Sequence, residues 1–134
     1  MPVISLSDQI HEAEVIALYR ANSWSSADKP AELLAALRGS HGLVTARIQG
    51  QLVGLANAIS DGHLVVYFPH VLVLPEFQRR GIGRQMFEAL IHRYREFHQL
   101  MITSGGDTVS FYQSMGFTRA GSTVPMWIYA GTEH

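Results

Sequence analysis

The sequence predicts a single α/β domain in which a mixed sheet carries helices on both faces. Two observations lead to this prediction. Segments of β type joined by tight turns occupy the middle of the chain, and a long helical pattern followed by a further buried strand comes after them. Strands joined by short turns pair antiparallel, whereas a strand–helix–strand crossover gives a parallel pair. The 134 residues match the length of one domain, so we expect residues 1–134 to form one unit.

The composition narrows the class of protein. Hydrophobic residues make up 47% of the chain and charged residues 16%, which favours an ordinary globular core. A formal net charge of -1 argues against a nucleic-acid partner, which would need a strongly basic surface. The lack of cysteine excludes disulfides, thiolate catalysis and cysteine-ligated zinc. No apolar run approaches about 18 residues and the N-terminus does not resemble a signal peptide, so we expect a cytoplasmic protein without a membrane partner.

The first third of the chain alternates between short β-type and helical patterns. A weakly alternating start is followed by apolar residues at helical spacing, then by a polar stretch and a second, shorter helical stripe. We expect, in order, a strand at 3–6, a helix capped by Ser7 or Asp8 that runs to about Asn22, a loop at 23–30, and a helix from Pro30 to Gly39.

The β pattern in the middle of the chain is interrupted by one proline. Gly50 and the pair Asp61-Gly62 are turn signals that separate three β-type segments, at 42–48, 52–59 and 63–74. Pro69 lies inside the third segment. Because proline removes a hydrogen bond from the ladder between strands, we expect the strand to bend or splay there.

Helical periodicity returns at Arg80, and its apolar stripe continues to Phe97. The change of period predicts a long helix packed on the sheet. The expected elements after it are a strand at 100–103, a loop at 104–106, a short helix capped by Asp107 and ended by Gly116, and two last strands at 117–120 and 125–130.

The junction between the third β segment and the long helix has the composition of an anion site. A helix N-terminus offers unpaired N–H donors and the positive end of the helix dipole, and glycine lets a ligand approach the backbone closely. Gly81 and Gly83 stand at this junction, flanked by Arg79, Arg80 and Arg84. Together they suit a diphosphate, although two glycines can also make a tight turn and nothing more. The spacing fits neither a Rossmann fingerprint nor a Walker loop.

Two motifs in this region resemble those of the GNAT superfamily of acyl-CoA-dependent N-acetyltransferases. Residues 78–83, Gln-Arg-Arg-Gly-Ile-Gly, match its Q/R-x-x-G-x-G/A signature, and residues 111–117, Phe-Tyr-Gln-Ser-Met-Gly-Phe, resemble its second landmark at the end of a helix. The strand at 71–75 also looks like that family's strand before the loop. The resemblance implies a GNAT-like fold, with a mixed, mostly antiparallel sheet that splays after its fourth strand.

The resemblance also implies a reaction and a cosubstrate. It implies transfer of an acetyl group from acetyl-CoA to a primary amine of a small molecule or peptide, by direct attack in a ternary complex and without a metal. The backbone of Val71, Leu72 and Val73 would pair with the pantetheine arm. The diphosphate would lie on the loop formed by Arg79, Arg80, Gly81, Ile82, Gly83 and Arg84. A non-catalytic acyl-CoA-binding or regulatory module on the same fold is the alternative, and a homodimer is left open.

Candidates for proton transfer differ in how clearly the sequence marks them. The resemblance makes Tyr112 the general acid for the departing thiolate, whereas a tyrosine on a short amphipathic helix can equally be a packing residue. The base is less clear. Tyr67 occupies the strand position where relatives place a base, but tyrosine is a poor base, and His70 beside the proline titrates in a more useful range. His63 and Glu96 are weaker candidates.

Three further features bear on the site. Relatives carry an asparagine that contacts the cofactor arm where this chain has Ser-Gly-Gly at 104–106, so that contact is not carried over. Trp24 follows the first helix in a polar loop, where it either lines the acceptor groove or covers the core. His92, Glu96 and His98 have the spacing of a solvated helix face rather than of a metal site.

Overall fold

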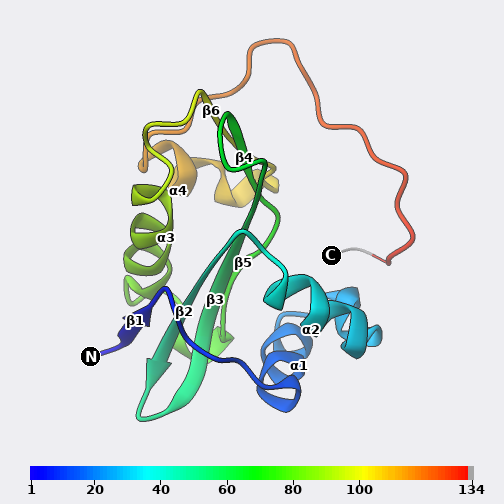
Figure 1. Cartoon of the computed structure of the whole chain (residues 1–134), viewed down its shortest axis with the longest axis vertical. Helices are drawn as coiled ribbons and strands as arrows, with labels where there is room; N and C mark the ends of the chain where they lie inside the picture. The colour runs from blue at the N-terminus through cyan, green and yellow to red at the C-terminus, as the bar shows by residue number, and fades with distance from the viewer. Residues whose placement is uncertain (133–134) are drawn as a thin grey trace.

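The computed structural model describes residues 1–132, and Figure 1 shows their arrangement. The strands are β1 (Val3–Ser5), β2 (Gly42–Ile48), β3 (Gln51–Ser60), β4 (Val65–Phe68), β5 (Val71–Val73) and β6 (Gln99–Ile102). The helices are α1 (Glu12–Ala21), α2 (Pro30–Arg38), α3 (Ile82–His92) and α4 (Val109–Gln113), with short 3-10 turns η1 (Ser25–Asp28), η2 (Pro75–Phe77) and η3 (Gly106–Thr108). Among these, no helix is both long and apolar enough to cross a membrane.

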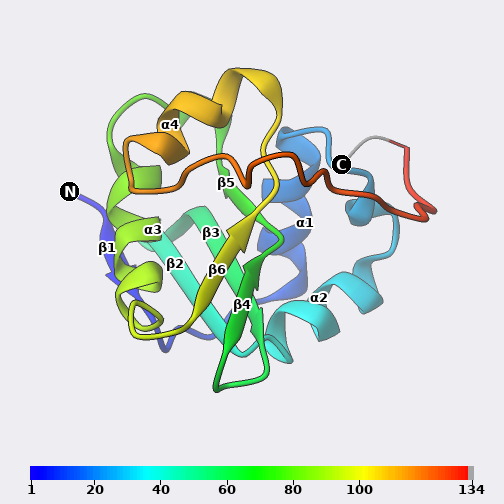
Figure 2. The ribbon, with the colours of Figure 1, turned by 90° about the horizontal axis from the view of Figure 1, so that it is seen from above.

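The strands form one mixed sheet between two layers of helices. Its order is β1-β2-β3-β4-β6, and β5 pairs with β3 beside β4. The pairing of β4 with β6 is parallel and the other pairings are antiparallel. In Figure 2, α1 and α2 lie on one side of the sheet and α3 lies on the other. The predicted mixed, mostly antiparallel sheet with helices on both faces is therefore confirmed.

The sequence in the middle of the chain is almost continuously apolar because it forms the centre of the hydrophobic core. Residues 52–58 of β3 are all buried, because α1 packs on one face of this strand and α3 on the other. Met86, Phe87 and Leu90 on the inward side of α3 have no solvent exposure. The ring of Phe87 meets the ring of Phe68 on β4 edge to face, with centroids 4.9 Å apart. Strand β3 is thus the central element that both helical layers share.

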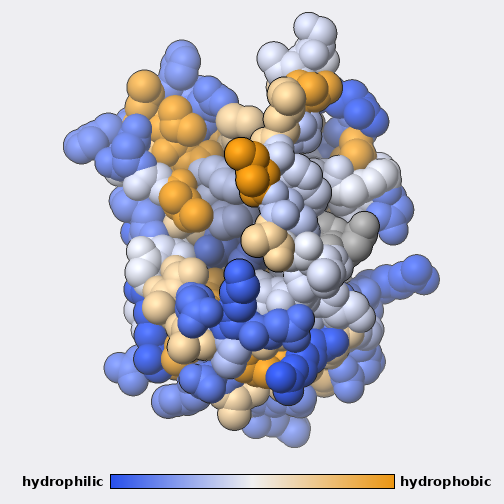
Figure 3. All heavy atoms as spheres, turned by 90° about the vertical axis from the view of Figure 1, so that its right-hand side faces the viewer, coloured by the Kyte–Doolittle hydropathy of each residue, from blue (hydrophilic) through white to orange (hydrophobic). Residues whose placement is uncertain are grey.

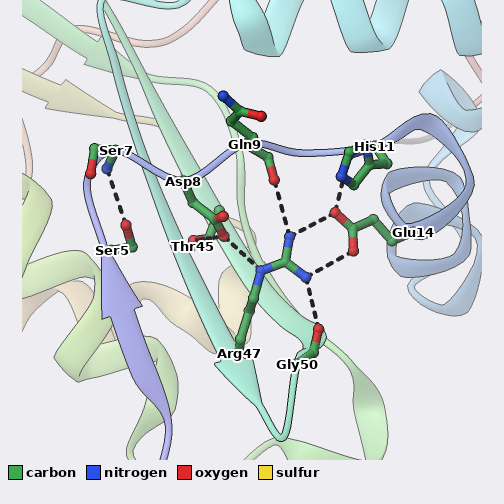
Figure 4. A network of polar contacts seen from close by, with 9 residues as sticks. All are labelled: Ser5, Ser7, Asp8, Gln9, His11, Glu14, Thr45, Arg47 and Gly50. Carbon is green, nitrogen blue, oxygen red and sulfur yellow. Dashed lines mark hydrogen bonds and ion pairs between the residues drawn. The ribbon is translucent and has the colours of Figure 1, made fainter.

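The start of α1 differs from the prediction because the expected cap residue is used elsewhere. Asp8 accepts hydrogen bonds from Thr45 and from Arg47, at 2.6 and 2.7 Å, and Arg47 also pairs with Glu14 of α1 at 2.7 Å (Figure 4). Desolvation alone would raise the pKa of Asp8, but its bonds to Thr45 and Arg47 outweigh that effect and lower it. The hydrogen bond from Arg47 likewise lowers the pKa of Glu14 against the effect of desolvation. The segment before α1 is therefore tied to β2, and the helix begins at Glu12 instead of just after Asp8.

Two other helix ends also correct the predictions. The helix expected to reach Phe97 ends at His92, because the backbone bonds beyond it connect residues three apart and form turns: Tyr94 donates to Ile91, and Phe97 to Tyr94. Asp107 does not cap the last helix. It lies inside η3, and α4 starts after Thr108.

The two strands predicted at 117–120 and 125–130 are absent from the described part of the chain. Residues 118–132 are exposed, and the backbone bond recorded within this segment closes a turn from Thr123 to Ala120. A strand needs a neighbour to satisfy its N–H and C=O groups, and this segment lies on no strand of its own chain. The segment is apolar, as a strand would be, but it has no strand partner in the described part of the chain.

Candidate active site

The sheet divides at Pro69 and His70. Strand β4 pairs with the end of β3, at Ile59 and Ser60, whereas β5 pairs with residues 54–56 of the same strand. The outer edge of β4 then pairs with β6, and that pairing ends at Phe68. Within residues 1–132 the outer edge of β5 pairs with no strand. The outer edge of β5 is therefore left without a strand partner, at the proline where the sequence predicted a splay, and the space along this edge is called the slot below.

The register shows which backbone groups face this slot. Asn57 donates to the carbonyl of His70, and Leu74 donates to the carbonyl of Val53, so both pairs are of the hydrogen-bonded kind. Hydrogen-bonded and non-hydrogen-bonded pairs alternate in an antiparallel ladder. The N–H and C=O of Val71 and Val73 therefore point to the slot, and those of Leu72 point to β3. Of the three residues expected to pair with the pantetheine arm, Val71 and Val73 therefore present main-chain groups to the slot, and Leu72 does not.

A buried asparagine holds the point of division. The side-chain oxygen of Asn57 accepts from the N–H of His70 at 3.1 Å, and its amide nitrogen donates to Ser40 Oγ at 3.0 Å. Asn57 is 3% exposed. An unpaired buried N–H at His70 would be costly, so Asn57 stabilises the irregular backbone after Pro69. Sequence reasoning missed this residue, although an asparagine inside an otherwise apolar strand was a usable signal.

The loop after β5 is held in shape by two side-chain amides. The carbonyl of Val73 accepts from Asn22 at 3.1 Å and from Gln78 at 2.9 Å. Beyond Gln78 the chain takes two left-handed conformations, at Arg79 with φ 64° and at Gly81 with φ 81°, before α3 begins at Ile82. Such turns aim successive N–H groups toward one side. The loop ends in the unpaired N–H groups of the first turn of α3, as the sequence predicted.

The three arginines of the loop differ in how many contacts they make with other side chains. Arg84 forms an ion pair with Glu88 at 3.3 Å, donates to Ser114, and lies over the ring of Phe111. Arg79 and Arg80 are exposed, and the Arg80 guanidinium lies 5.2 Å from the centre of the Phe77 ring. The charge most available to an anion therefore comes from Arg79 and Arg80, and Arg84 joins α3 to α4.

His70 lies in an aromatic cluster on the α1 side of the sheet. Its Nδ1 is 2.7 Å from the hydroxyl of Tyr19, and its ring packs edge to face against Tyr19 and Trp24, at 5.3 and 5.0 Å. Burial raises the pKa of Tyr19 far above its usual value, so that hydroxyl keeps its proton. The structure thus brings His70 and Trp24 together, and adds Tyr19, which sequence reasoning had placed only as part of a helix.

Tyr112 lies on the other helical layer. Its ring packs edge to face against Phe87 of α3 and against Phe117, at 5.6 and 6.0 Å. Burial raises its pKa to about 12. Its neighbour Phe111 reaches within 4.0 Å of a Cβ built on Gly83, and Val73 comes within 3.7 Å of the same position. Helix α4 therefore adjoins both the loop and the end of β5, and the Tyr112 hydroxyl keeps its proton at neutral pH.

The weaker candidates for the base lie elsewhere or are engaged. The hydroxyl of Tyr67 is 3.2 Å from that of Thr103, beyond the end of β6. His63 lies in the turn between β3 and β4, at the opposite end of β4 from Pro69, where its N–H donates to Asp61. Glu96 is exposed in the turns after α3. His70 is thus the one of these candidates that lies at the division of the sheet.

The sequence model of the acetyltransferase (GNAT) domain matches residues 9–126. The chain belongs to the GNAT acetyltransferase family. A GCN5-related N-acetyltransferase 2 of Arabidopsis thaliana chloroplasts is 26% identical over 118 residues, which cover 87% of this chain and 43% of the relative. A histone acetyltransferase TAP1 of Glycine max is 33% identical over 86 residues, 63% of this chain and 37% of the relative. The chain thus spans about two fifths of the length of these GNAT relatives.

Solved GNAT structures agree with the fold over nearly the whole chain. A GNAT family acetyltransferase of Streptococcus pneumoniae superposes with a TM-score of 0.81 and 29% identity, covering 97% of this chain and 99% of that one. An aminoglycoside N-acetyltransferase solved in complex with CoA has a TM-score of 0.73 and 18% identity, over 97% and 95% of the two chains. The second likeness shows the fold alone. Membership of the GNAT family implies acyl transfer from acetyl-CoA.

Proposed function

We propose that this GNAT domain transfers the acetyl group of acetyl-CoA to a primary amine of a small molecule or peptide, by direct attack in a ternary complex. The observation that carries the proposal is the open edge of β5, which runs into a loop of left-handed residues at the start of α3. The C=O of Val71 and the N–H of Val73 match the amide groups of a pantetheine arm, and the N–H of Val71 is left for the thioester. The loop at 79–84 suits the diphosphate.

The reaction assigns a task to each group around the slot. The amine nitrogen attacks the thioester carbonyl, and a new C–N bond forms as the carbonyl oxygen becomes an oxyanion. The Val71 N–H, which points to the slot, is placed to stabilise that oxyanion. When the C–S bond breaks, the Tyr112 hydroxyl supplies the proton that the thiolate takes, and His70 accepts the proton that the amine loses. Alignment of the two substrates in the slot supplies the rest of the acceleration.

The contact with Tyr19 bears on how His70 can act. An imidazole accepts a proton only at the nitrogen that carries none. The proposed base is Nε2, which requires that Nδ1–H donate to the Tyr19 oxygen across their 2.7 Å contact. Tyr19 is then a positioning residue, because it selects the tautomer and orients the ring.

A non-catalytic acyl-CoA-binding module would keep the slot and the loop without needing either proton-transfer residue. The acetyltransferase differs from such a module in one requirement, because the enzyme needs a protonated donor beside the thioester sulfur. Tyr112, whose pKa burial raises to about 12, keeps its proton at neutral pH and lies on α4, which adjoins the loop and the end of β5. This favours the enzyme.

Replacement of Gly81 by glutamate should weaken the binding of CoA at least tenfold. The added side chain is negatively charged and stands in the loop, at a backbone angle that favours glycine. Isothermal titration with CoA measures the effect. Gly50→Glu is a matched control, because both glycines have φ near 80° and neither would place a Cβ within 4 Å of another atom. Equal affinities for the two variants would contradict the assignment of the loop.

Tyr112→Phe should lower kcat by about 10²–10⁴-fold, the usual range for loss of a general acid, while CoA affinity changes only a few-fold. The measurement is release of free thiol in the presence of an amine found by an acceptor screen. Tyr94→Phe is the control, since it removes a buried hydroxyl that is bonded to His41 instead. An unchanged kcat in the Tyr112 variant would show that this residue contributes to packing and not to proton transfer.

His70→Gln should abolish the limb of the pH–rate profile in which kcat rises with pH. The limb rises with pH because a base must lose its own proton before it can accept another. His63→Gln, which changes an exposed histidine in a turn, should leave the profile as it is. If the His70 variant keeps both the rate and the limb, the proton leaves through solvent alone.

A further inference from the structure

A cavity lies at the end of α2, away from the slot. It has a volume of about 510 Å³, and its walls are the segment between β1 and α1, the end of α2, the start of β2 and Arg93 after α3. Ligand-binding pockets in proteins commonly have volumes of about 300–1,000 Å³. This space, hereafter the α2 cavity, is therefore large enough for a small molecule.

The α2 cavity and the slot lie beside opposite edges of β3. Strand β2, which contributes Leu43 to the cavity, pairs with one edge of β3, and β5 pairs with the other. Asn57 of β3 stands between them, since its side chain donates to Ser40 Oγ in the cavity wall and accepts from the N–H of His70. A molecule in the α2 cavity would therefore leave the slot free.

Aliphatic side chains form the inner part of the α2 cavity. Ile10 and Leu37 belong to the hydrophobic core, with 2% and 1% exposure, and Leu43 packs against that core. By contrast, the lower part of the face in Figure 3, where α1 and α2 lie, is mainly hydrophilic. Apolar side chains that line a concave site within a polar surface suit the apolar part of a ligand.

Two arginines of the α2 cavity carry charge that no carboxylate compensates. Arg38 donates to the carbonyl of Ile10 at 2.9 Å, and the guanidinium of Arg93 lies 5.7 Å from the centre of the Tyr94 ring. Both arginines are exposed, and within residues 1–132 neither forms an ion pair. A guanidinium has five N–H donors, so these contacts leave most of them available to a ligand.

The carboxylate in the cavity wall does not offset these arginines. Asp8 accepts a hydrogen bond from Thr45 and pairs with Arg47 at 2.7 Å, and Figure 4 shows its carboxylate turned toward these two residues of β2. Its negative charge is therefore already compensated. The cavity combines an apolar inner part with an excess of positive charge, which favours an anion that has an apolar body.

We propose that the α2 cavity binds a small organic carboxylate. The apolar body of the ligand packs on Ile10, Leu37 and Leu43, and its carboxylate binds Arg38 and Arg93. A guanidinium forms charge-assisted hydrogen bonds with both oxygens of a carboxylate, which makes this pairing stronger than one between neutral groups. Burial of the apolar body adds stabilisation in proportion to the area removed from water. This proposal does not depend on the proposed function.

A titration with hexanoate tests the site directly. The probe carries a carboxylate on a short apolar chain, and the readout is the NMR signals of the methyl groups. We expect the methyl signals of Leu37 and Leu43 to shift in the same way with and without CoA, while those of Val71 and Val73 beside the slot respond to CoA alone. Hexanol, which lacks the charge, and inorganic phosphate, which lacks the apolar body, should each bind more weakly than hexanoate.

Arg93→Gln should weaken hexanoate binding about tenfold, because it removes charge-assisted hydrogen bonds to the carboxylate. Arg95→Gln is the matched control, since Arg95 is an exposed arginine of the same turns that does not line the cavity, and it should leave the affinity unchanged. Equal affinities for the two variants, or hexanol that binds as tightly as hexanoate, would overturn the proposal. So would the absence of any shift at Leu37 and Leu43, or shifts at Val71 and Val73 that CoA abolishes, because hexanoate would then occupy the slot.

Discussion

The backbone of His70 exchanges two hydrogen bonds with Asn57, one to the main chain and one to the side chain, and these bonds hold the sheet where it divides. Without them, the residue after Pro69 would leave a part-buried N–H unpaired, next to a proline that has no N–H of its own. They allow β4 to continue toward β6 while β5 stays on β3. The slot, the outward edge of β5 and the position of the His70 ring all follow from this division.

The groups proposed to bind acetyl-CoA are mostly main chain, and the side chains around them maintain the shape of that main chain. Asn22 and Gln78 hold the carbonyl of Val73, and Gly81 permits the turn into α3. Side chains matter directly in two places, His70 on the α1 layer and Tyr112 on the α3 layer. The proposed base and acid thus lie on opposite faces of the sheet, which suits a reaction that gains and loses protons on two different atoms.

Local signals predicted much of this arrangement. Turn glycines and helical periodicity predicted the positions of most helices and strands. Pro69 predicted where the sheet divides, and the glycines at 81 and 83 predicted the loop before α3. What the sequence could not show were contacts across long separations, such as Tyr19 with His70, which are 51 residues apart.

The prediction that Asp8 caps α1 failed because Asp8 binds Arg47, a partner that is distant in the sequence. The two last strands were also wrong, since residues 118–132 pair with no strand in the described part of the chain. The cytoplasmic location, the extent of the domain and the lack of metal, nucleic-acid and membrane partners stay predictions.

The most direct test of the central claim is amide hydrogen exchange measured by NMR at Val71, Leu72 and Val73, with and without CoA. The account predicts that Leu72, bonded to β3, exchanges slowly in both states. Val71 and Val73, which point to the slot, should exchange faster in the free protein and slow down when CoA is added. If CoA binds to the protein but leaves the exchange rates of the Val71 and Val73 amides unchanged, the open edge of β5 is not the binding site.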